Sequence, residues 1–314
     1  MPRVDILKAL DVSAAGTVLV QPEIDKVVAQ IVDYRNPLRQ NLPRKKGSGD
    51  AWHIIRRTPS GTTPAAWVAD SDDIVEDEGT YTKVSFYYKT IVARVKVTRK
   101  MQAIGRSYAD ILADEIEARA LEFRDKEDYA YVIGASSANS SSKEFMGLMY
   151  QLQSAAQTVA CAASTTPGSL TLAKMDEAMD LSTGNIGMII MSKKTRRLLN
   201  ALLQANQRFV NTVKVKGGFV TLAYNEAPIF TSNNIPNTVS YAADGTTVSA
   251  LSGGTASFIE FVDLDHVWVG ELTPVTVMPL AKTTSQYDVV DIYCDETLVV
   301  RNPYTCALLT NIGA

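Results

Sequence analysis

The feature that most constrains this chain is a long β pattern, residues 50–97, that has no core of its own. From Tyr81 to Val97, β-branched and aromatic side chains recur at alternate positions, and a shorter strand pattern covers Ala51 to Ile55. We predict one long β-hairpin, whose tip region is the acidic segment from Ala69 to Thr80. A two-stranded ribbon is marginally stable alone in water, so this one must lie on another surface. We expect that surface to be a neighbouring subunit.

The charges near this hairpin form blocks of opposite sign. Between Arg35 and Arg57 they are almost all positive, and Asp50 is the exception. Residues 70–78 are then strongly acidic, and basic residues return from Lys83 to Lys100. Two interpretations stay open: the blocks are solvated faces, or patches on identical copies meet and fix the register of assembly.

A long helix follows the hairpin. Ser107 to Asp110 resembles a capping box, and the helical pattern runs from there to about Ile133, before Gly134. At this length the helix is a rod of about 40 Å, which suits a structural spine better than a compact enzyme core. The predicted apolar stripe is Ile104, Tyr108, Ile111, Leu112, Ile116, Ala120 and Phe123, and the charged residues predicted to face elsewhere are Asp110, Asp114, Glu117, Arg124 and Asp128.

The remaining segments mix helix and strand. Before the hairpin, residues 1–33 form an arm with a short helix predicted over 22–32. After the long helix, the pattern predicts helices over 172–181 and 193–209, strands over 186–191 and 227–231, and a loop over 213–218. The final part is all β in pattern, so the class is α+β. The predicted final strands are 257–262, 267–272, 275–280, 289–295, 297–301 and 306–311.

Composition excludes several classes of protein. The chain has 314 residues, with 46% hydrophobic and 21% charged residues, which are ordinary values for a folded protein. The net charge of -3 is not typical of a protein that clamps nucleic acid with a basic patch. No apolar run is long enough to span a bilayer, and the first residues do not resemble a secretory signal. Cys161, Cys294 and Cys306 show no metal-binding spacing, and we expect them to be small buried hydrophobes.

The sequence offers no catalytic, cofactor or metal site. Its two histidines, His53 and His266, lie in predicted strand segments without a zinc or nucleophile motif, and no phosphate-binding glycine motif occurs. The pair Asp72 and Asp73 could bind a hard cation, but solvated loop carboxylates are commoner. Core packing is the expected role of Trp67 and Trp268.

Several stretches resemble one known family, the major capsid proteins of tailed bacteriophages, which have the Hong Kong ninety-seven type of fold. The fold is shared with encapsulin nanocompartments. The likeness covers nearly the whole chain in the right order, although no single motif is highly specific. The stretches are Gly16 to Glu23, Asn36 to Arg39 as a strand, Ala66 to Asp70 with Phe86 to Val97, Glu127 to Gly134 with Phe145 to Leu148, Met191 to Leu199, and Ala227 to Pro236.

The resemblance implies a phage capsid-type α+β fold with an N-terminal arm, an extended β-hairpin loop, a long spine helix, a peripheral β-sheet domain and an α/β axial domain. The implied layout is 1–33 N-terminal arm, 34–49 peripheral domain strand, 50–97 extended loop, 98–180 peripheral domain with spine helix 107–133, 181–270 axial domain, 271–301 peripheral domain strands and 302–314 axial domain terminal strand.

The resemblance also implies a function. Copies would assemble into hexamers and pentamers of an icosahedral shell around double-stranded DNA, with each extended loop lying across the adjacent subunit. The partners would be many copies of the chain, with a scaffolding protein, a portal and a decoration protein as further candidates, DNA contacted weakly if at all, and no membrane. Assembly would take place in the host cytoplasm. The expected subunit-interface residues are Trp67, Asp70, Asp72, Asp73, Glu76, Lys83, Arg35, Arg39, Lys45 and Lys46.

Two alternatives to the viral shell stay open at this point. An encapsulin-like shell would package a cargo enzyme instead of a genome, and an unrelated cytosolic enzyme would have to work without any recognised motif. Some family members also form a lysine to asparagine cross-link, for which Lys83 with Asn206 or Asn211 would be available. No buried acid that would catalyse this reaction can be identified from the sequence.

Overall fold

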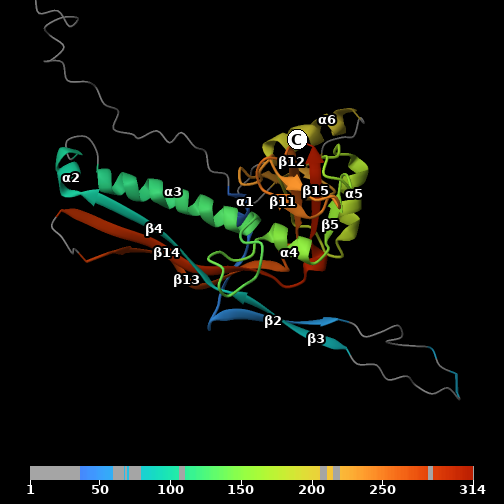
Figure 1. Ribbon diagram of the computed structural model, residues 1–314, viewed down its shortest axis with the longest axis horizontal. Helices are drawn as coiled ribbons and strands as arrows, with labels where there is room; N and C mark the ends of the chain where they lie inside the picture. The colour runs from blue at the N-terminus through green and yellow to red at the C-terminus, as the bar shows by residue number, and fades with distance from the viewer. Residues whose placement is uncertain are drawn as a thin grey trace, which may run out of the picture.

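The computed structural model describes residues 36–58, 67, 69–70, 79–105, 110–205, 211–214, 220–281 and 286–313. Two sheets dominate it, and a long helix lies along one of them (Figure 1). The predicted α+β class is confirmed. The predicted arm helix over 22–32 lies outside the described residues.

A seven-stranded mixed sheet forms one body, with strand order β5-β15-β12-β6-β9-β8-β7. β12 is central and buried along its whole length, and it runs antiparallel to both β15 and β6. The strands of this sheet are β5 (Thr158–Ala160), β6 (Met188–Met191), β7 (Asn211–Lys214), β8 (Val220–Tyr224), β9 (Ala227–Thr231), β12 (Ala256–Val262) and β15 (Ala307–Gly313).

Helices cover both faces of this sheet, which is why its central strands are continuously apolar. Helices α5 (Leu172–Leu181) and α6 (Lys193–Ala205) pack one face through Met175 and Leu199. The short helix α4 (Leu148–Ser154) and the end of the long helix cover the other face. Thr171 caps α5, because its hydroxyl accepts a hydrogen bond from the Lys174 backbone N–H.

The second sheet has four strands in the order β1-β13-β14-β4. The long helix α3 (Ile111–Val132) lies along one face of it (Figure 1). Ile116 and Phe123 of α3 pack against alternate residues of β4 and β14, as the predicted apolar stripe requires. The strands are β1 (Arg44–Lys46), β4 (Lys89–Thr98), β13 (Val267–Pro279) and β14 (Tyr287–Val300).

The end of α3 agrees with the predicted stop at Gly134, but its start differs, because Asp110 is the N-cap residue and not the last residue of a capping box that begins at Ser107. Asp110 caps its start by accepting a hydrogen bond from the Ala113 backbone N–H, while Ser107 lies outside the described residues. At its end Gly134 has a φ of 54°, and a Cβ there would meet the Phe145 carbonyl oxygen. Only glycine tolerates both conditions. Ile104 does not belong to this helix: it lies exposed on a separate short helix, α2 (Arg99–Gly105).

The predicted hairpin is real but shorter than expected. β2 (Ala51–Thr58) pairs antiparallel with β3 (Thr80–Tyr87), and these two strands form a ribbon of their own that projects from the body (Figure 1). The chain leaves the ribbon at Tyr88, and β4 joins the four-stranded sheet. The strand-like sequence continues across this break, but the covered side changes from Phe86, an even-numbered residue of β3, to Val95 and Val97, odd-numbered residues of β4.

The segment Asn36 to Arg39 was expected to be a strand, but this expectation is wrong. The segment leads into the short helix α1 (Pro37–Asn41). Pro37 occupies the first turn, where its fixed φ suits a helix and its missing N–H costs nothing. The strand of this region is β1, five residues further on. Its three residues pair in parallel with β13 at Val269, Gly270 and Glu271.

The C-terminal strands are longer than predicted. The segments 267–272 and 275–280 are one strand, β13, with irregular register around Thr273, and 289–295 and 297–301 lie mostly within β14. Part of the predicted loop 213–218 belongs to β7, which pairs with β8. Between 237 and 255 a small hairpin forms from β10 (Ser240–Tyr241) and β11 (Val248–Ala250).

Sheet membership also differs from the expected layout. β5 and α5 lie on the seven-stranded sheet, although both fall within 98–180. β13 joins the four-stranded sheet from Val267 onward, slightly before the expected boundary at 270. A short 3-10 helix, Pro303–Thr305, returns the chain to the seven-stranded sheet for β15.

Candidate assembly surfaces

Within the described part of the chain, no group of histidine, cysteine and carboxylate side chains is placed to hold a metal ion. His53 lies exposed, with Nδ1 2.9 Å from the Ser85 hydroxyl, and His266 precedes β13 instead of lying in a strand. Cys294 and Cys306 are buried as expected, and Cys161 is partly buried. Among the helices described, none is long and apolar enough to cross a membrane.

The ribbon has one covered and one open face. Phe86 and Trp52 lie on the face that packs against Trp268 and Val299 of the body. Cross-strand neighbours on the other face include Ile55, which is 71% exposed, and Tyr81, which is 67% exposed. Arg57 and Lys83 lie beside them, and we call these four residues the open ribbon face.

The base of the ribbon is fixed to the body by polar and aromatic contacts. Arg56 donates hydrogen bonds to the backbone carbonyls of Arg301 (3.0 Å) and Val300 (2.6 Å). The Trp52 and Trp268 rings meet edge to face with centroids 6.0 Å apart, and the Lys45 ammonium lies 3.6 Å from the Trp268 ring centroid. These contacts fix the direction in which the ribbon leaves the body.

The expected interface residues divide into three groups. Trp67 is fully exposed, so its expected core role is wrong, and Asp70, Lys46 and Lys83 are also exposed. Arg39 and Lys45 have partners inside their own chain. Arg35, Asp72, Asp73 and Glu76 lie outside the described residues.

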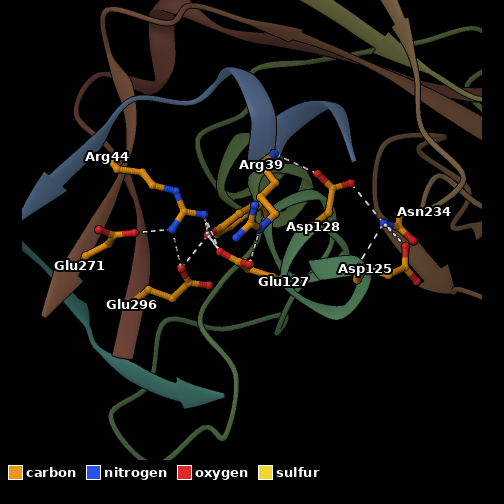
Figure 2. A network of polar contacts seen from close by, with 9 residues as sticks. Arg39, Arg44, Asp125, Glu127, Asp128, Asn234, Glu271 and Glu296 are labelled. Carbon is orange, nitrogen blue, oxygen red and sulfur yellow. Dashed lines mark hydrogen bonds and ion pairs between the residues drawn. The ribbon is translucent and has the colours of Figure 1, made fainter. Parts of the chain in front are cut away.

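A buried ion-pair network lies where α1, β1, α3, β13 and β14 meet (Figure 2). We call Arg39, Arg44, Glu127, Tyr131, Glu271 and Glu296 the hub. Glu127 is fully buried, and its two oxygens lie 2.5 Å from Arg39 Nε and from Arg44 Nη2. Arg44 also pairs with Glu271, and its Nη1 lies 3.8 Å from Glu296 Oε2.

The hub shifts the pKa values of its members in opposite directions. Burial alone would raise the pKa of Glu127, but hydrogen bonds and charge from Arg39 and Arg44 outweigh it and hold this pKa below its usual value. Burial, and then the nearby charge of Glu127, raise the pKa of Glu296 to about 8. Burial would lower the pKa of Arg44, yet Tyr131, Glu127 and Glu271 together raise it.

A second polar group lies on the other side of α3 (Figure 2). The Asp128 carboxylate accepts hydrogen bonds from the Arg39 backbone N–H (3.0 Å) and from Asn234 Nδ2 (3.1 Å), and Asn234 also reaches Asp125. Asp128 is buried instead of facing outward, and burial raises its pKa to about 6. Consecutive residues of one helix thus bind the segment after the arm on two sides.

The hub was not predicted from the sequence. One signal was available: Glu296 continues the inward-facing alternation of Ile292 and Cys294 along β14, and a charged residue in such a series needs a buried partner. The partners are distant in sequence, so the pattern alone could not identify them.

Comparisons with known proteins agree with this architecture. The family model described as SU10 major capsid protein matches residues 11–313. A comparison with curated protein sequences gave no match. Among solved structures, the capsid of an empty GTA particle is 15% identical with a TM-score of 0.68, and it covers 98% of this chain and 100% of its own.

Two further structures show the same fold. The Microbacterium phage Oxtober96 structure is 15% identical with a TM-score of 0.66, covering 96% of this chain and 99% of that one. The holo-SrpI encapsulin complex of Synechococcus elongatus PCC 7942 is 12% identical with a TM-score of 0.68, covering 98% and 97%. At these sequence identities the solved structures establish the fold alone. The family is established by the match to the SU10 major capsid protein model.

Proposed function

Because the chain belongs to the SU10 major capsid protein family, we propose that its copies close into an icosahedral shell of hexamers and pentamers around double-stranded DNA. The protein is a structural capsid subunit of a virion and not an enzyme. It assembles with many copies of itself.

The main structural support for the proposed shell is the open ribbon face. A single copy leaves Ile55 and Tyr81 in water, because they lie on the face of the ribbon that points away from the body. Aromatic and aliphatic residues gathered at one exposed place are typical of a protein interface. The ribbon therefore docks on an adjacent subunit, where these side chains leave water.

Charge supports the same contact. The acidic residues of 70–78, among them Asp72, Asp73 and Glu76, fit basic residues of a neighbour. Lys46, Arg57 and Lys83 are exposed and available for this pairing, whereas Arg39 and Lys45 serve the subunit itself. In this arrangement the seven-stranded sheet is the axial domain and the four-stranded sheet with α3 is the peripheral domain.

Further partners complete the proposal. A scaffolding protein, a portal and a decoration protein would act with the shell, and assembly would take place in the host cytoplasm. Packaged DNA would touch the chain weakly if at all, since the net charge is -3. An encapsulin-like compartment with a cargo enzyme is the second candidate, supported by the fold shared with the SrpI encapsulin.

Electron microscopy of purified particles, with analysis of their contents, tests the function. We expect closed icosahedral shells that protect double-stranded DNA from nuclease when they are isolated from producing cells. Shells that contain a co-purifying enzyme and no DNA would favour the compartment instead. A compact monomer at all concentrations would contradict both.

A further inference from the structure

The hub does more than hold the subunit together. We propose that Tyr131 and the carboxyl groups of Glu127 and Glu296 form a one-proton site that ties the segment from α1 to β1 to the body, and that loss of this proton loosens the tie. The ligand is a proton, and the response is a local opening at the base of the ribbon. This inference is independent of shell assembly, because all its groups belong to one chain.

The two contacts of the Tyr131 hydroxyl group require an additional proton on one of the carboxyl groups. The Tyr131 hydroxyl oxygen lies 2.8 Å from Glu127 Oε1 and 2.6 Å from Glu296 Oε2, and all three groups are buried. A phenol has one hydrogen, so it donates to one carboxylate only. If both carboxylates were ionised, the other contact would set two lone pairs against each other at hydrogen-bond distance. A second proton, carried by one carboxyl group, removes this repulsion.

Geometry assigns that proton to Glu296. Glu127 has a guanidinium 2.5 Å from each oxygen, which stabilises its charge. Glu296 has only Arg44, at 3.8 Å, and in the described structure its Oε1 is buried without a hydrogen-bond partner. An unpartnered carbonyl oxygen of a neutral acid costs less than an unpartnered carboxylate oxygen. The raised pKa of Glu296, about 8, agrees with this assignment.

The charges around Glu296 balance only when it is neutral. Arg39 and Arg44 face Glu127 and Glu271, which gives two charges of each sign. Two further groups adjoin Glu296 in the sheet. Lys89, its cross-strand neighbour on β4, donates to the backbone carbonyls of Asn139 and Ser140, and the Cys294 thiol has a pKa raised by burial and by Glu296. A charged Glu296 would therefore leave the buried hub with an uncompensated negative charge.

The hub joins α1 and β1 to the rest of the subunit, together with Leu38 and Leu42 in the core and the hydrogen bond from the Arg39 backbone N–H to Asp128. Arg39 comes from α1 and Arg44 from β1, and their carboxylate partners come from α3, β13 and β14. Beyond them, β1 pairs with only three residues of β13. The next residue, Lys45, covers the Trp268 ring that supports Trp52 of the ribbon. Opening the hub thus frees the support on which the ribbon stands.

The direction of the pH effect follows from linkage. When the segment from α1 to β1 opens, Glu296 stays on β14 but regains water, so its pKa falls from about 8 in the closed hub towards the ordinary glutamate value of about 4.3. The proton's stabilisation of the closed hub is fully present when the pH is below the pKa of the opened state. It is lost as the pH rises towards the pKa of the closed state. Between them the opening equilibrium rises up to about tenfold per pH unit, and above about 8 it stays constant.

Amide hydrogen exchange of the full-length protein between pH 6.5 and 7.5 tests this. Asp128, whose pKa is about 6, is mostly ionised throughout this range. Protection factors, which remove the intrinsic pH dependence of exchange, should fall about tenfold in residues 37–47 of the wild type. They should stay constant in residues 111–116 of α3, which pack on Val95 and Val97 away from the hub.

Two matched variants identify the responsible group. In Glu296→Gln the amide donates to Tyr131 without a titrating proton, so residues 37–47 should lose their pH dependence. Glu260→Gln alters another buried carboxyl group with a raised pKa, outside the hub, and should behave as the wild type. A pH dependence that persists in Glu296→Gln, or disappears in Glu260→Gln, would overturn the proposal. If Glu296→Gln fails to fold, the wild type alone still tests the proposal. Protection factors that change equally with pH in residues 37–47 and 111–116 would overturn it.

Discussion

Glu127 shows how one buried side chain can stabilise several elements at once. Its carboxylate contacts Arg39, Arg44 and Tyr131, so α1, β1 and α3 depend on the same charge. Breaking a buried pair by removing one partner is costly, because the remaining charges stay buried without compensation.

We expect Glu127→Gln to lower the free energy of unfolding by about 3 kcal/mol. The reason is that both guanidiniums lose their principal anion while remaining partly buried. Glu115→Gln is the matched control: its pair with Arg119 is exposed on α3, so its loss should cost less than about 0.5 kcal/mol. Chemical denaturation of both variants measures the difference, and equal losses would contradict the role assigned to the hub.

At the residue scale, the sequence predicted signals between neighbouring residues, such as helix ends, better than contacts between residues distant in the chain. The stop at Gly134 was correct, since it depends on neighbouring residues only, whereas Asp110 is the N-cap itself and not the last residue of a capping box that begins at Ser107. Trp67 and Asp128 were wrong in opposite senses: the tryptophan is exposed and the carboxylate is buried. Their environment is decided by packing between distant segments, which the local pattern does not contain.

At the element scale, the ribbon is the part whose surroundings are least complete. One face packs on Trp268, and the other carries Ile55 and Tyr81 in water. An interface core made of such residues loses affinity when they become polar, whereas the free subunit loses little, because these side chains are already exposed.

The double change Ile55→Ser with Tyr81→Ser should therefore block shell formation while shifting the subunit's melting temperature by less than about 3 °C. The control is Thr80→Ala with Thr82→Ala, on the opposite face of the same ribbon, which should assemble normally. Light scattering and electron microscopy report assembly. Normal shells from the serine variant would exclude the open ribbon face as an interface.

The element predictions failed mainly at boundaries between sheets. β3 and β4 form one uninterrupted run of strand-favouring residues, so the sequence did not show that the chain changes sheets at Tyr88. β13 was divided in two at Pro274, which is typical of a turn, and β14 was divided at Glu296, a charged residue inside a strand-like pattern. A residue period reports exposure along a strand and contains no information about which strand lies beside it.

At the scale of the whole molecule, the order of elements was more informative than any one of them. Arm, hairpin, long helix, mixed domain and returning strands together predicted the capsid family, which the match over residues 11–313 confirms. The hub escaped prediction because its members come from residues 39 to 296.

Protease sensitivity should distinguish free subunits from shells. Trypsin can cleave after Arg57 and Lys83, which are exposed on the ribbon of a single copy. The proposed docking of the ribbon would cover these sites in assembled shells, so we expect cleavage there to slow by at least about tenfold. Mass spectrometry of the fragments locates the cuts, and Lys193 and Lys194 on α6 provide a comparison outside the ribbon. Equal cleavage of the ribbon in both forms would contradict its burial on assembly.

The ribbon is anchored at both outer edges of the four-stranded sheet, through β1 on one side and β4 on the other. Any tension applied to the ribbon in a pressurised particle therefore divides between two unequal anchors. β4 is paired with β14 along its whole length, whereas β1 has three paired residues and the Arg44 ion pairs. Mechanical yielding should begin at the β1 anchor, while the β4 anchor keeps the subunit attached to its neighbours.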